Sequence, residues 1–194
     1  MRRRGTVEIS DGQLVEELRQ GSKSAFVALY DRHKLKIYQY CVRMMKDQGE
    51  AEDAVQSVFL RLYERANQID CPDKVCSWLY CVARNFCLTR MRVQATVAAV
   101  ESESAGSMED TTLIDEIEER RKGLAPLVRQ GIAHLSPELR EIIILREFQE
   151  LTYKEIAEIV SANESTVKFR LFTARRKLSE LLYPKLRGTP HHEL

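Results

Sequence analysis

Few of the features that mark a secreted, membrane-bound or disulfide-linked protein occur in this sequence of 194 residues. No apolar run approaches the roughly 18 residues that a membrane-spanning helix needs. The basic run at residues 2–4 leads into a polar stretch rather than into the apolar core of a signal peptide. The five cysteines are an odd number in a chain without an export signal, which argues against a disulfide framework. We therefore expect a cytoplasmic protein with no membrane span.

Catalytic and cofactor motifs are also missing. The four histidines have no ligand spacing with acids or cysteines, and no glycine-rich phosphate loop occurs. An enzyme is therefore the least favoured class, and we predict neither a metal nor a cofactor. The 8 glycines and 5 prolines interrupt the chain rarely, and strand-like alternation of apolar and polar residues is absent. The fold is predicted to be all-α.

One group of side chains suggests metal or redox chemistry, and it consists of Cys71, Cys76, Cys81 and Cys87. Their spacings differ from the paired C-x-x-C of common zinc sites. On a straight helix, Cys81 points away from Cys76 and Cys87. We favour reduced thiols that are buried or solvated, and we keep a cysteine-based metal or redox sensor as an alternative function.

Charge is distributed unevenly along the chain, although the total is only +1. Residues 93–119 contain acidic side chains and no lysine or arginine, whereas residues 1–92 and 120–194 each have an excess of basic side chains. Basic segments of a cytoplasmic protein suggest nucleic acid, because lysine and arginine that neutralise phosphates release condensed counterions. Ordinary solvated helix faces are the alternative on charge alone.

Apolar residues recur with helical period in two stretches, one on each side of the acidic segment. We predict two small helical domains, residues 11–92 and 120–183, joined by a flexible acidic linker at residues 93–119. The expected helices cover residues 11–20, 24–46, 50–66, 74–92, 120–134, 136–147, 152–160 and 164–182. Ser136 is expected to cap the helix that begins at Pro137.

The last two helices have the spacing of a helix-turn-helix. Thr152 and Glu155 form a capping box at the start of the first. The three residues 161–163 make the turn, and Asn163 can cap the second helix. Two helices so close together define the motif, whose second helix enters the major groove of DNA.

The second helix of this motif carries a polar and basic outward face. We assign Thr166, Phe169, Arg170 and Thr173 to base edges, which need donors, acceptors or a surface for the thymine methyl group. Lysine and arginine side chains farther along the same helix are placed to contact the phosphates of the DNA backbone. The remaining candidates at this DNA surface are Ser165, Lys168, Arg175, Arg176 and Lys177. Phe172 has an intermediate angular position, and we expect it to pack.

On the helix at residues 50–66, the face opposite the buried stripe holds Asp53, Gln56, Ser57 and Leu60. An exposed leucine beside acid and amide groups is typical of a protein-binding patch. A scattered surface leucine is common and needs no explanation. The pattern alone therefore favours a scattered leucine over a binding patch.

Several motifs in fixed order resemble the extracytoplasmic-function sigma factors of the sigma-70 family. Residues 50–63 (EAEDAVQSVFLRLY) resemble the family's core-polymerase-binding helix, and residues 77–85 (SWLYCVARN) resemble its promoter-opening segment. Residues 135–140 (LSPELR) and 151–157 (LTYKEIA) are similar to its C-terminal domain, as are Thr166-Val167-Lys168 and Arg170-Leu171.

The resemblance implies core RNA polymerase and promoter DNA as partners, with an anti-sigma factor expected by family analogy. It implies that Asp53, Gln56 and Leu60 bind polymerase, with Glu52 a weaker candidate because its angle is nearer the buried face. The loop from Asn67 to Lys74 would hold a flipped base near the minus-ten element. Contacts to the opened strand would come from Tyr80, Arg84, Asn85 and Arg90. Aromatic and cationic side chains suit single-stranded DNA.

Trp78 and Phe86 fall on the buried stripe of their helix, and we assign both to the core. The resemblance has departures in the second domain. Phe169 and Thr173 stand where many relatives have a small polar and a basic residue, and Ser161 and Ser165 stand where glycine is frequent. The acidic linker would thread into the polymerase cleft or act as a spacer.

The leading hypothesis is thus an alternative sigma factor, a non-catalytic specificity subunit of RNA polymerase. The main competitor is a stand-alone helix-turn-helix regulator, which would not need the patch around Leu60. Such a regulator would bind duplex DNA specifically without polymerase.

Overall fold

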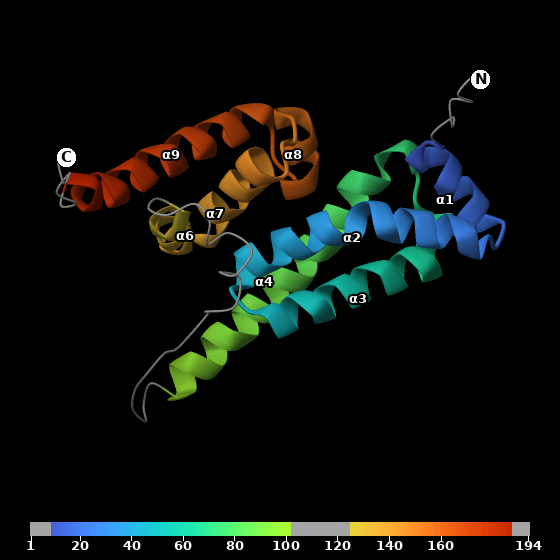
Figure 1. Ribbon diagram of the computed structural model, residues 1–194, viewed down its shortest axis with the longest axis horizontal. Helices are drawn as coiled ribbons and strands as arrows, with labels where there is room; N and C mark the ends of the chain where they lie inside the picture. The colour runs from blue at the N-terminus through green and yellow to red at the C-terminus, as the bar shows by residue number, and fades with distance from the viewer. Residues whose placement is uncertain (1–8, 102–124, 188–194) are drawn as a thin grey trace, which may run out of the picture.

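The computed structural model describes residues 9–101 and 125–187, and every regular element in these two stretches is a helix (Figure 1). The elements are α1 (Asp11–Arg19), α2 (Lys23–Met45), α3 (Gln48–Arg65), η1 (Ala66–Gln68), η2 (Pro72–Lys74), α4 (Val75–Glu101), α6 (Ala125–Ala133), α7 (Pro137–Ile143), η3 (Ile144–Phe148), α8 (Tyr153–Val160) and α9 (Glu164–Arg187). The predicted all-α class with two helical domains is confirmed. In the described part of the chain, no helix has the length and apolar character needed to span a membrane.

Local sequence signals set most of the helix starts. At α8, the Thr152 hydroxyl accepts the Glu155 N–H at 3.3 Å, and the Glu155 carboxylate accepts the Thr152 N–H at 2.7 Å, which is the predicted capping box. Hydrogen bonds from the Thr152 hydroxyl and backbone lower the pKa of Glu155. At α7, Ser136 occupies the cap position but its side chain makes no cap hydrogen bond, so the predicted hydroxyl cap was wrong. Pro137 at the first helical turn favours this start instead.

Three predicted helix ends differ from the structure. Helix α4 continues to Glu101, beyond the predicted end at Arg92, because the intervening residues contain neither glycine nor proline. The predicted linker therefore overlaps this helix, and its remaining residues lie outside the described part of the chain. The predicted helix at 136–147 ends as the π turn η3, in which the Gln149 N–H donates to the Ile144 carbonyl at 3.1 Å. Helix α9 runs on to Arg187.

Each domain has apolar side chains buried between its helices. In the first, α2, α3 and α4 pack together and α1 covers one end (Figure 1), with Leu29, Leu62 and Leu79 fully buried. In the second, α9 packs across α6, α7 and α8, with Ile142 and Ile156 fully buried. These buried stripes follow the 3.6-residue period of the sequence, so the fold of each domain follows from its own amphipathic helices.

The two domains also pack against each other. The turn η3 and helix α7 contact α2, while α8 contacts α4 (Figure 1). The buried apolar side chains form one continuous cluster through both domains. This docking was not predicted from the sequence, and it decides which of the candidate site residues are accessible.

Helix α8 ends at Ser161 in the left-handed region, with φ at 53°. A side chain costs energy there, whereas glycine does not. We expect Ser161→Gly to raise the free energy of unfolding by about 1 kcal/mol, measured by urea titration. As a control, Ser179→Gly in the exposed interior of α9 should lower it by about the same amount. Equal losses in both variants would show that Ser161 is not strained.

Candidate functional site

Three predicted polymerase-binding residues of α3 lie together on the surface. Asp53, Gln56 and Leu60 line a shallow depression together with Ser57. The Leu60 side chain is 56 % exposed, which is high for a large apolar residue. Glu52, predicted to turn nearer the buried face, is exposed. We call the surface formed by Asp53, Gln56, Ser57 and Leu60 the α3 patch.

Helix α4 completes this depression with two residues that were assigned elsewhere. Phe86, predicted to lie in the core, is half-buried and lines the depression. Arg90, predicted to contact the promoter strand, lines it too. The Arg90 Nε lies 2.9 Å from a Glu50 carboxylate oxygen, and its guanidinium lies 5.5 Å from the Phe86 ring centre. Arg90 thus supplies positive charge beside Asp53, from which its Nη2 is 3.9 Å away.

The loop between α3 and α4 is held against α1. Arg19 donates from its Nε to the Ala66 carbonyl at 2.9 Å and from Nη2 to the Ile69 carbonyl. Ile69 is buried beneath the loop, whereas Asn67 is exposed. Anchored backbone with outward polar side chains is suited to holding a ligand in one geometry.

The most important correction concerns Tyr80, which was predicted to face outward. Its side chain is 1 % exposed, and its hydroxyl donates to Gln149 Oε1 at 2.8 Å. Burial raises the pKa of the Tyr80 hydroxyl. Its ring makes a T-shaped contact with Tyr40 of α2, at 5.5 Å between ring centres, and Gln149 of the second domain accepts its hydroxyl. The angular position of a residue on its own helix does not show which neighbouring helices cover its side chain.

Arg84 and Lys74 are also engaged by the second domain. The Arg84 Nε lies 2.9 Å from Glu141 Oε1, and the Lys74 ammonium lies 2.7 Å from Glu158 of α8. Glu141 is 2 % exposed and also accepts the Tyr40 hydroxyl at 2.9 Å. Burial raises the pKa of Glu141, and the Arg84 charge acts in the opposite direction. Asn85, in contrast, is exposed.

Sequence reasoning missed Glu141, Gln149 and Tyr40 as members of this region. One signal was available for Glu141, because it is an acid directly before the apolar run Ile142-Ile143-Ile144-Leu145. A buried acid requires a partner, so its position on the apolar face indicated a polar contact across an interface.

The helix-turn-helix has the predicted geometry. Asn163 Oδ1 accepts the Thr166 N–H at 2.7 Å and so caps α9. Val167 and Leu171 are buried against α7 and α8, which turns the opposite face of α9 outward. On that face Phe169 is 70 % exposed. Phe172 is 65 % exposed, so the prediction that it packs was wrong.

The cations and hydroxyls of α9 have different surroundings. Arg175 pairs with Glu147, Arg176 lies 3.8 Å from Glu180, and the Lys168 ammonium lies 5.6 Å from the Tyr153 ring centre. Arg170 is half-buried, and its charge offsets part of the rise in pKa that burial causes at Glu141. The Thr173 hydroxyl donates to the Phe169 carbonyl at 2.9 Å. Two further predicted residues, Ser165 and Lys177, are exposed.

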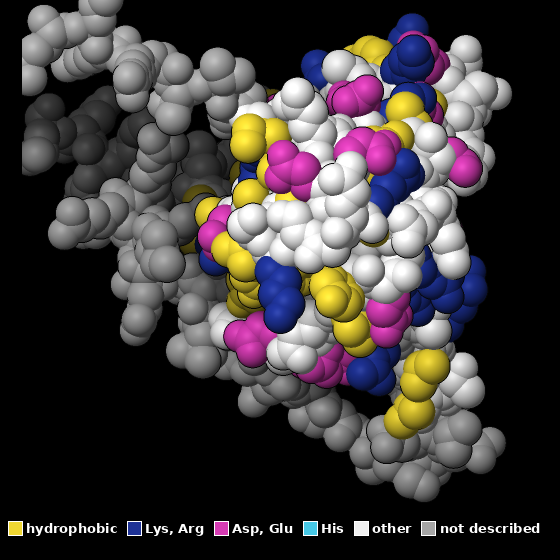
Figure 2. Space-filling view, turned by 90° about the vertical axis from the view of Figure 1, so that its right-hand side faces the viewer, with side chains coloured by type: hydrophobic (Ala, Val, Ile, Leu, Met, Phe, Trp, Pro, Cys, Tyr) yellow, Lys and Arg dark blue, Asp and Glu magenta, His cyan; other side chains and the backbone are white. Residues whose placement is uncertain are grey.

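The end of the molecule that carries α1 differs from this basic helix. Figure 2 shows acidic and basic side chains interspersed there with apolar ones. A surface of mixed sign creates no strong field for a polyanion.

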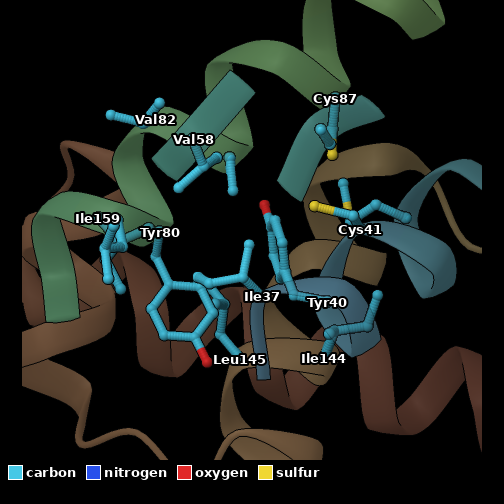
Figure 3. Packing of buried hydrophobic residues seen from close by; sticks show 14 of the residues in the cluster. Ile37, Tyr40, Cys41, Val58, Tyr80, Val82, Cys87, Ile144, Leu145 and Ile159 are labelled. Atoms are coloured by element: carbon cyan, nitrogen blue, oxygen red, sulfur yellow. The ribbon is translucent and has the colours of Figure 1, made fainter. Parts of the chain in front are cut away.

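All five cysteines are free thiols, and they differ in burial. Cys71 is exposed, Cys76 and Cys81 are partly buried, and Cys87 is buried beside Cys41 (Figure 3). Burial raises the pKa of Cys76 to about 11, which makes it a poor nucleophile. Among the residues that the structure describes, no group of three or more histidine, cysteine, aspartate or glutamate side chains is arranged to hold a metal ion.

Comparison with known proteins identifies the class to which these surfaces belong. Residues 29–96 match the family model described as Sigma-70 region 2, and residues 127–178 match Sigma-70, region 4. The RNA polymerase sigma-H factor of Pseudomonas aeruginosa is 33 % identical over 91 % of this chain and 96 % of its own. The ECF RNA polymerase sigma factor SigW of Bacillus subtilis is 31 % identical over 87 % of this chain and 94 % of its own.

Solved structures share the fold. CnrH, in complex with the cytosolic domain of CnrY, has a TM-score of 0.67 at 21 % identity over 90 % of this chain and 97 % of the matched chain. The sigma factor RpoE of Bartonella quintana, in complex with the anti-sigma factor NepR, has a TM-score of 0.64 at 19 % identity over 87 % and 98 %. The chain belongs to the extracytoplasmic-function sigma factors of the sigma-70 family.

Proposed function

We propose that this chain acts in the cytoplasm as a non-catalytic specificity subunit that binds core RNA polymerase and directs it to a set of promoters. The observation that carries the proposal is the presence of two separate surfaces in one sigma-family chain. The α3 patch has the character of a protein-binding site, and the outward face of α9 has the character of a duplex-reading site. A stand-alone regulator needs only the second surface.

The α3 patch fits a protein partner for physical reasons. Leu60 offers apolar area that water solvates poorly, and Asp53 and Gln56 beside it supply a charge and an amide for orientation. Arg90 extends the patch with a cation that is already aligned by Glu50. We therefore assign Arg90 to polymerase binding rather than to the promoter strand.

The loop and α4 are proposed to hold the opened minus-ten strand. Asn67 is exposed on a loop that Arg19 keeps in one position, so it can hydrogen-bond an unstacked base. Lys74, Arg84 and Asn85 lie farther along the same surface and suit the strand's phosphates and bases.

Helix α9 is proposed to read the minus-thirty-five element as duplex. Ser165, Thr166 and Arg170 lie near its start, where a recognition helix contacts base edges. Lys168, Arg175, Arg176 and Lys177 are proposed to contact phosphates. Two phenyl rings, Phe169 and Phe172, complete the face, and thymine methyl groups are the apolar feature that they can contact in the major groove.

Replacing a promoter thymine with deoxyuridine tests whether Phe169 or Phe172 contacts its methyl group, because the replacement removes only that group. At a thymine that Phe169 or Phe172 contacts, we expect replacement by deoxyuridine to lower promoter affinity about fourfold, the equivalent of about 0.8 kcal/mol. Holoenzyme binding to each substituted promoter is the measurement. The variants Phe169→Ser and Phe172→Ala should each lose the response at one position, whereas Lys168→Ala should weaken all promoters alike. If both phenylalanine variants still lost affinity at every deoxyuridine position where the unmodified chain does, the assignment would be contradicted.

We also propose an anti-sigma protein as a partner. CnrH and RpoE, which share this fold, were solved with CnrY and with the anti-sigma factor NepR. Co-purification of this chain from its own cell extract, followed by run-off transcription with and without the bound protein, tests that partner. A bound protein that leaves transcription unchanged would not be an anti-sigma factor.

The function as a whole is tested by run-off transcription with purified core polymerase and a promoter library. Promoter-specific transcripts that depend on this chain support a sigma factor. Specific duplex binding by the chain alone, without any such transcript, supports the stand-alone regulator.

A further inference from the structure

We propose that helix α1 sets how strictly the loop between α3 and α4 selects its base, with Arg19 and Gly12 as positioning residues. This inference rests on the proposed function, which assigns that loop to an unstacked base of the opened minus-ten strand. Neither residue is assigned a contact with the strand. Each acts through the loop, whose position decides where the exposed loop side chains point.

Arg19 holds the first half of the loop. Its Nε donates to the Ala66 carbonyl at 2.9 Å, and its Nη2 donates to the Ile69 carbonyl. The Ala66 carbonyl also accepts the Ile69 N–H at 3.3 Å, which closes the turn η1. The exposed side chains of Asn67 and Gln68 lie between these two anchored carbonyls. One guanidinium group therefore fixes the backbone on both sides of two polar side chains that can reach a base.

Gly12 holds the second half of the loop through its lack of a side chain. A Cβ at this position would lie 2.1 Å from Asp73 Oδ1 and 3.0 Å from Asp73 Cγ. Asp73 therefore packs directly on the first turn of α1, where the helix dipole favours a negative charge. Gly12 and Arg19 stand about 10 Å apart along the helix axis. Helix α1 thus contacts the loop near both of its ends.

Helix α1 is itself anchored in the first domain. His33 of α2 is 6 % exposed, and its Nε2 lies 2.8 Å from Asp11 Oδ2 in the first turn of α1. The other carboxylate oxygen of Asp11 accepts a hydrogen bond from the Arg32 guanidinium. The apolar face of α1, which includes Val15, is buried in the core. The loop therefore rests on an element that the rest of the domain holds in place.

A fixed loop affects base selection more than overall affinity. One base is distinguished from another by hydrogen bonds to its edge, and these bonds weaken steeply when the donor or acceptor is misaligned. Contacts to phosphates, in contrast, carry no sequence information. Loosening the grip of α1 on the loop should therefore leave strand binding in place and remove the preference for one base.

The experiment uses holoenzyme and a promoter identified by run-off transcription. Forked duplexes of this promoter carry each of the four bases in turn at single positions of the unpaired minus-ten strand. The unmodified chain identifies the position with the largest ratio of affinity for the preferred base to affinity for the others. Arg19→Lys and Gly12→Ala should each lower this ratio about tenfold, with affinity for the non-preferred bases changed less than about twofold.

The change from arginine to lysine isolates the geometry of the contact. Arg19→Lys keeps the positive charge, but a single ammonium group cannot replace a planar fork that reaches two carbonyls. Nη1 of this fork lies 2.7 Å from a Glu16 carboxylate oxygen, so the guanidinium is already oriented within α1. A change in the ratio therefore reports the position of the loop and not the loss of a charge.

Asp73→Ala tests whether Gly12 acts through the loop. This variant removes the carboxylate that a Cβ at residue 12 would meet. Adding Gly12→Ala to Asp73→Ala should therefore leave the ratio nearly unchanged, although Gly12→Ala alone lowers it. An equal effect of Gly12→Ala in both backgrounds would overturn the assignment of Gly12 as a positioning residue.

Two matched controls make the same chemical changes elsewhere in the first domain. Lys23→Arg exchanges the same two cations at an exposed position of α2. Gly49→Ala adds a methyl group at an exposed position of α3, where a Cβ would lie 3.4 Å from Asp47 Oδ1, an ordinary contact distance. Both controls should keep the ratio of the unmodified chain.

Circular dichroism identifies a variant that does not fold, and the other variant then carries the test. An unchanged ratio in Arg19→Lys and Gly12→Ala would overturn the proposal, because base selection would not depend on α1. An equal loss of affinity for all four bases would also overturn it, because the role of both residues would be structural only. A lack of base preference in the unmodified chain would contradict the proposed function itself, and it is seen before any variant is measured.

Discussion

Replacing Leu60 with aspartate is expected to lower promoter-specific transcription about a hundredfold, which is the effect of losing one central contact of a protein interface. The side chain is 56 % exposed and lies among Asp53, Gln56 and Ser57, so the change adds a charge beside an acid. Folding should be unaffected, because no core contact is lost. Affinity for core polymerase, measured by surface plasmon resonance, should fall together with transcription.

Leu35→Asp is the matched control for this variant. Leu35 is an exposed leucine of α2, 62 % accessible and outside the α3 patch. Transcription by Leu35→Asp should equal that of the unmodified chain. If both variants lost activity equally, the α3 patch would have no special role, and Leu60 would be one more surface leucine.

Replacing Leu62 with alanine is expected to lower the free energy of unfolding by about 2–5 kcal/mol, because it leaves a cavity in a packed core. Leu62 lies two residues after Leu60 on the same helix, but it is fully buried. In a domain of this size such a loss is a large part of the total stability. Urea unfolding followed by circular dichroism gives the value.

The variants at Leu60 and Leu62 distinguish the role of the exposed face of α3 from that of its buried face. At a temperature where Leu62→Ala remains folded, its affinity for core polymerase should stay close to that of the unmodified chain. Leu60→Asp should show the reverse, with normal stability and lost affinity. A loss of stability in Leu60→Asp similar to that of Leu62→Ala would mean that the patch belongs to the core.

Most of the fold was predictable because each helix carries its own signals. The apolar period located the buried stripe of α3, and the capping box of Thr152 and Glu155 located the start of α8. The grouping of Asp53, Gln56 and Leu60 followed from the same period, since residues on one face of a helix remain together in any packing.

The remaining features depend on contacts between helices that no local pattern encodes. Tyr80 was predicted to face outward, but its ring packs against Tyr40 of α2 and its hydroxyl donates to Gln149 of the second domain. Arg90 and Phe86 reach the α3 patch because α4 crosses beside α3. Helical angles alone could not show which neighbour covers a given face.

Phe172 shows that the angular position of a side chain on its helix does not always predict its burial. Its intermediate angle on α9 suggested packing, because exposed phenyl rings are costly in water. The structure leaves it 65 % exposed beside Phe169, on the face opposite the buried residues of this helix. This observation underlies the proposed reading of thymine methyl groups.

The most direct test of the central claim is run-off transcription with purified core polymerase, a promoter library and three forms of this chain. The unmodified chain should yield a defined set of promoter-specific transcripts, Leu60→Asp should yield few of them, and Phe169→Ser should yield a different set. Specific duplex binding by the unmodified chain without any dependent transcript would contradict the account.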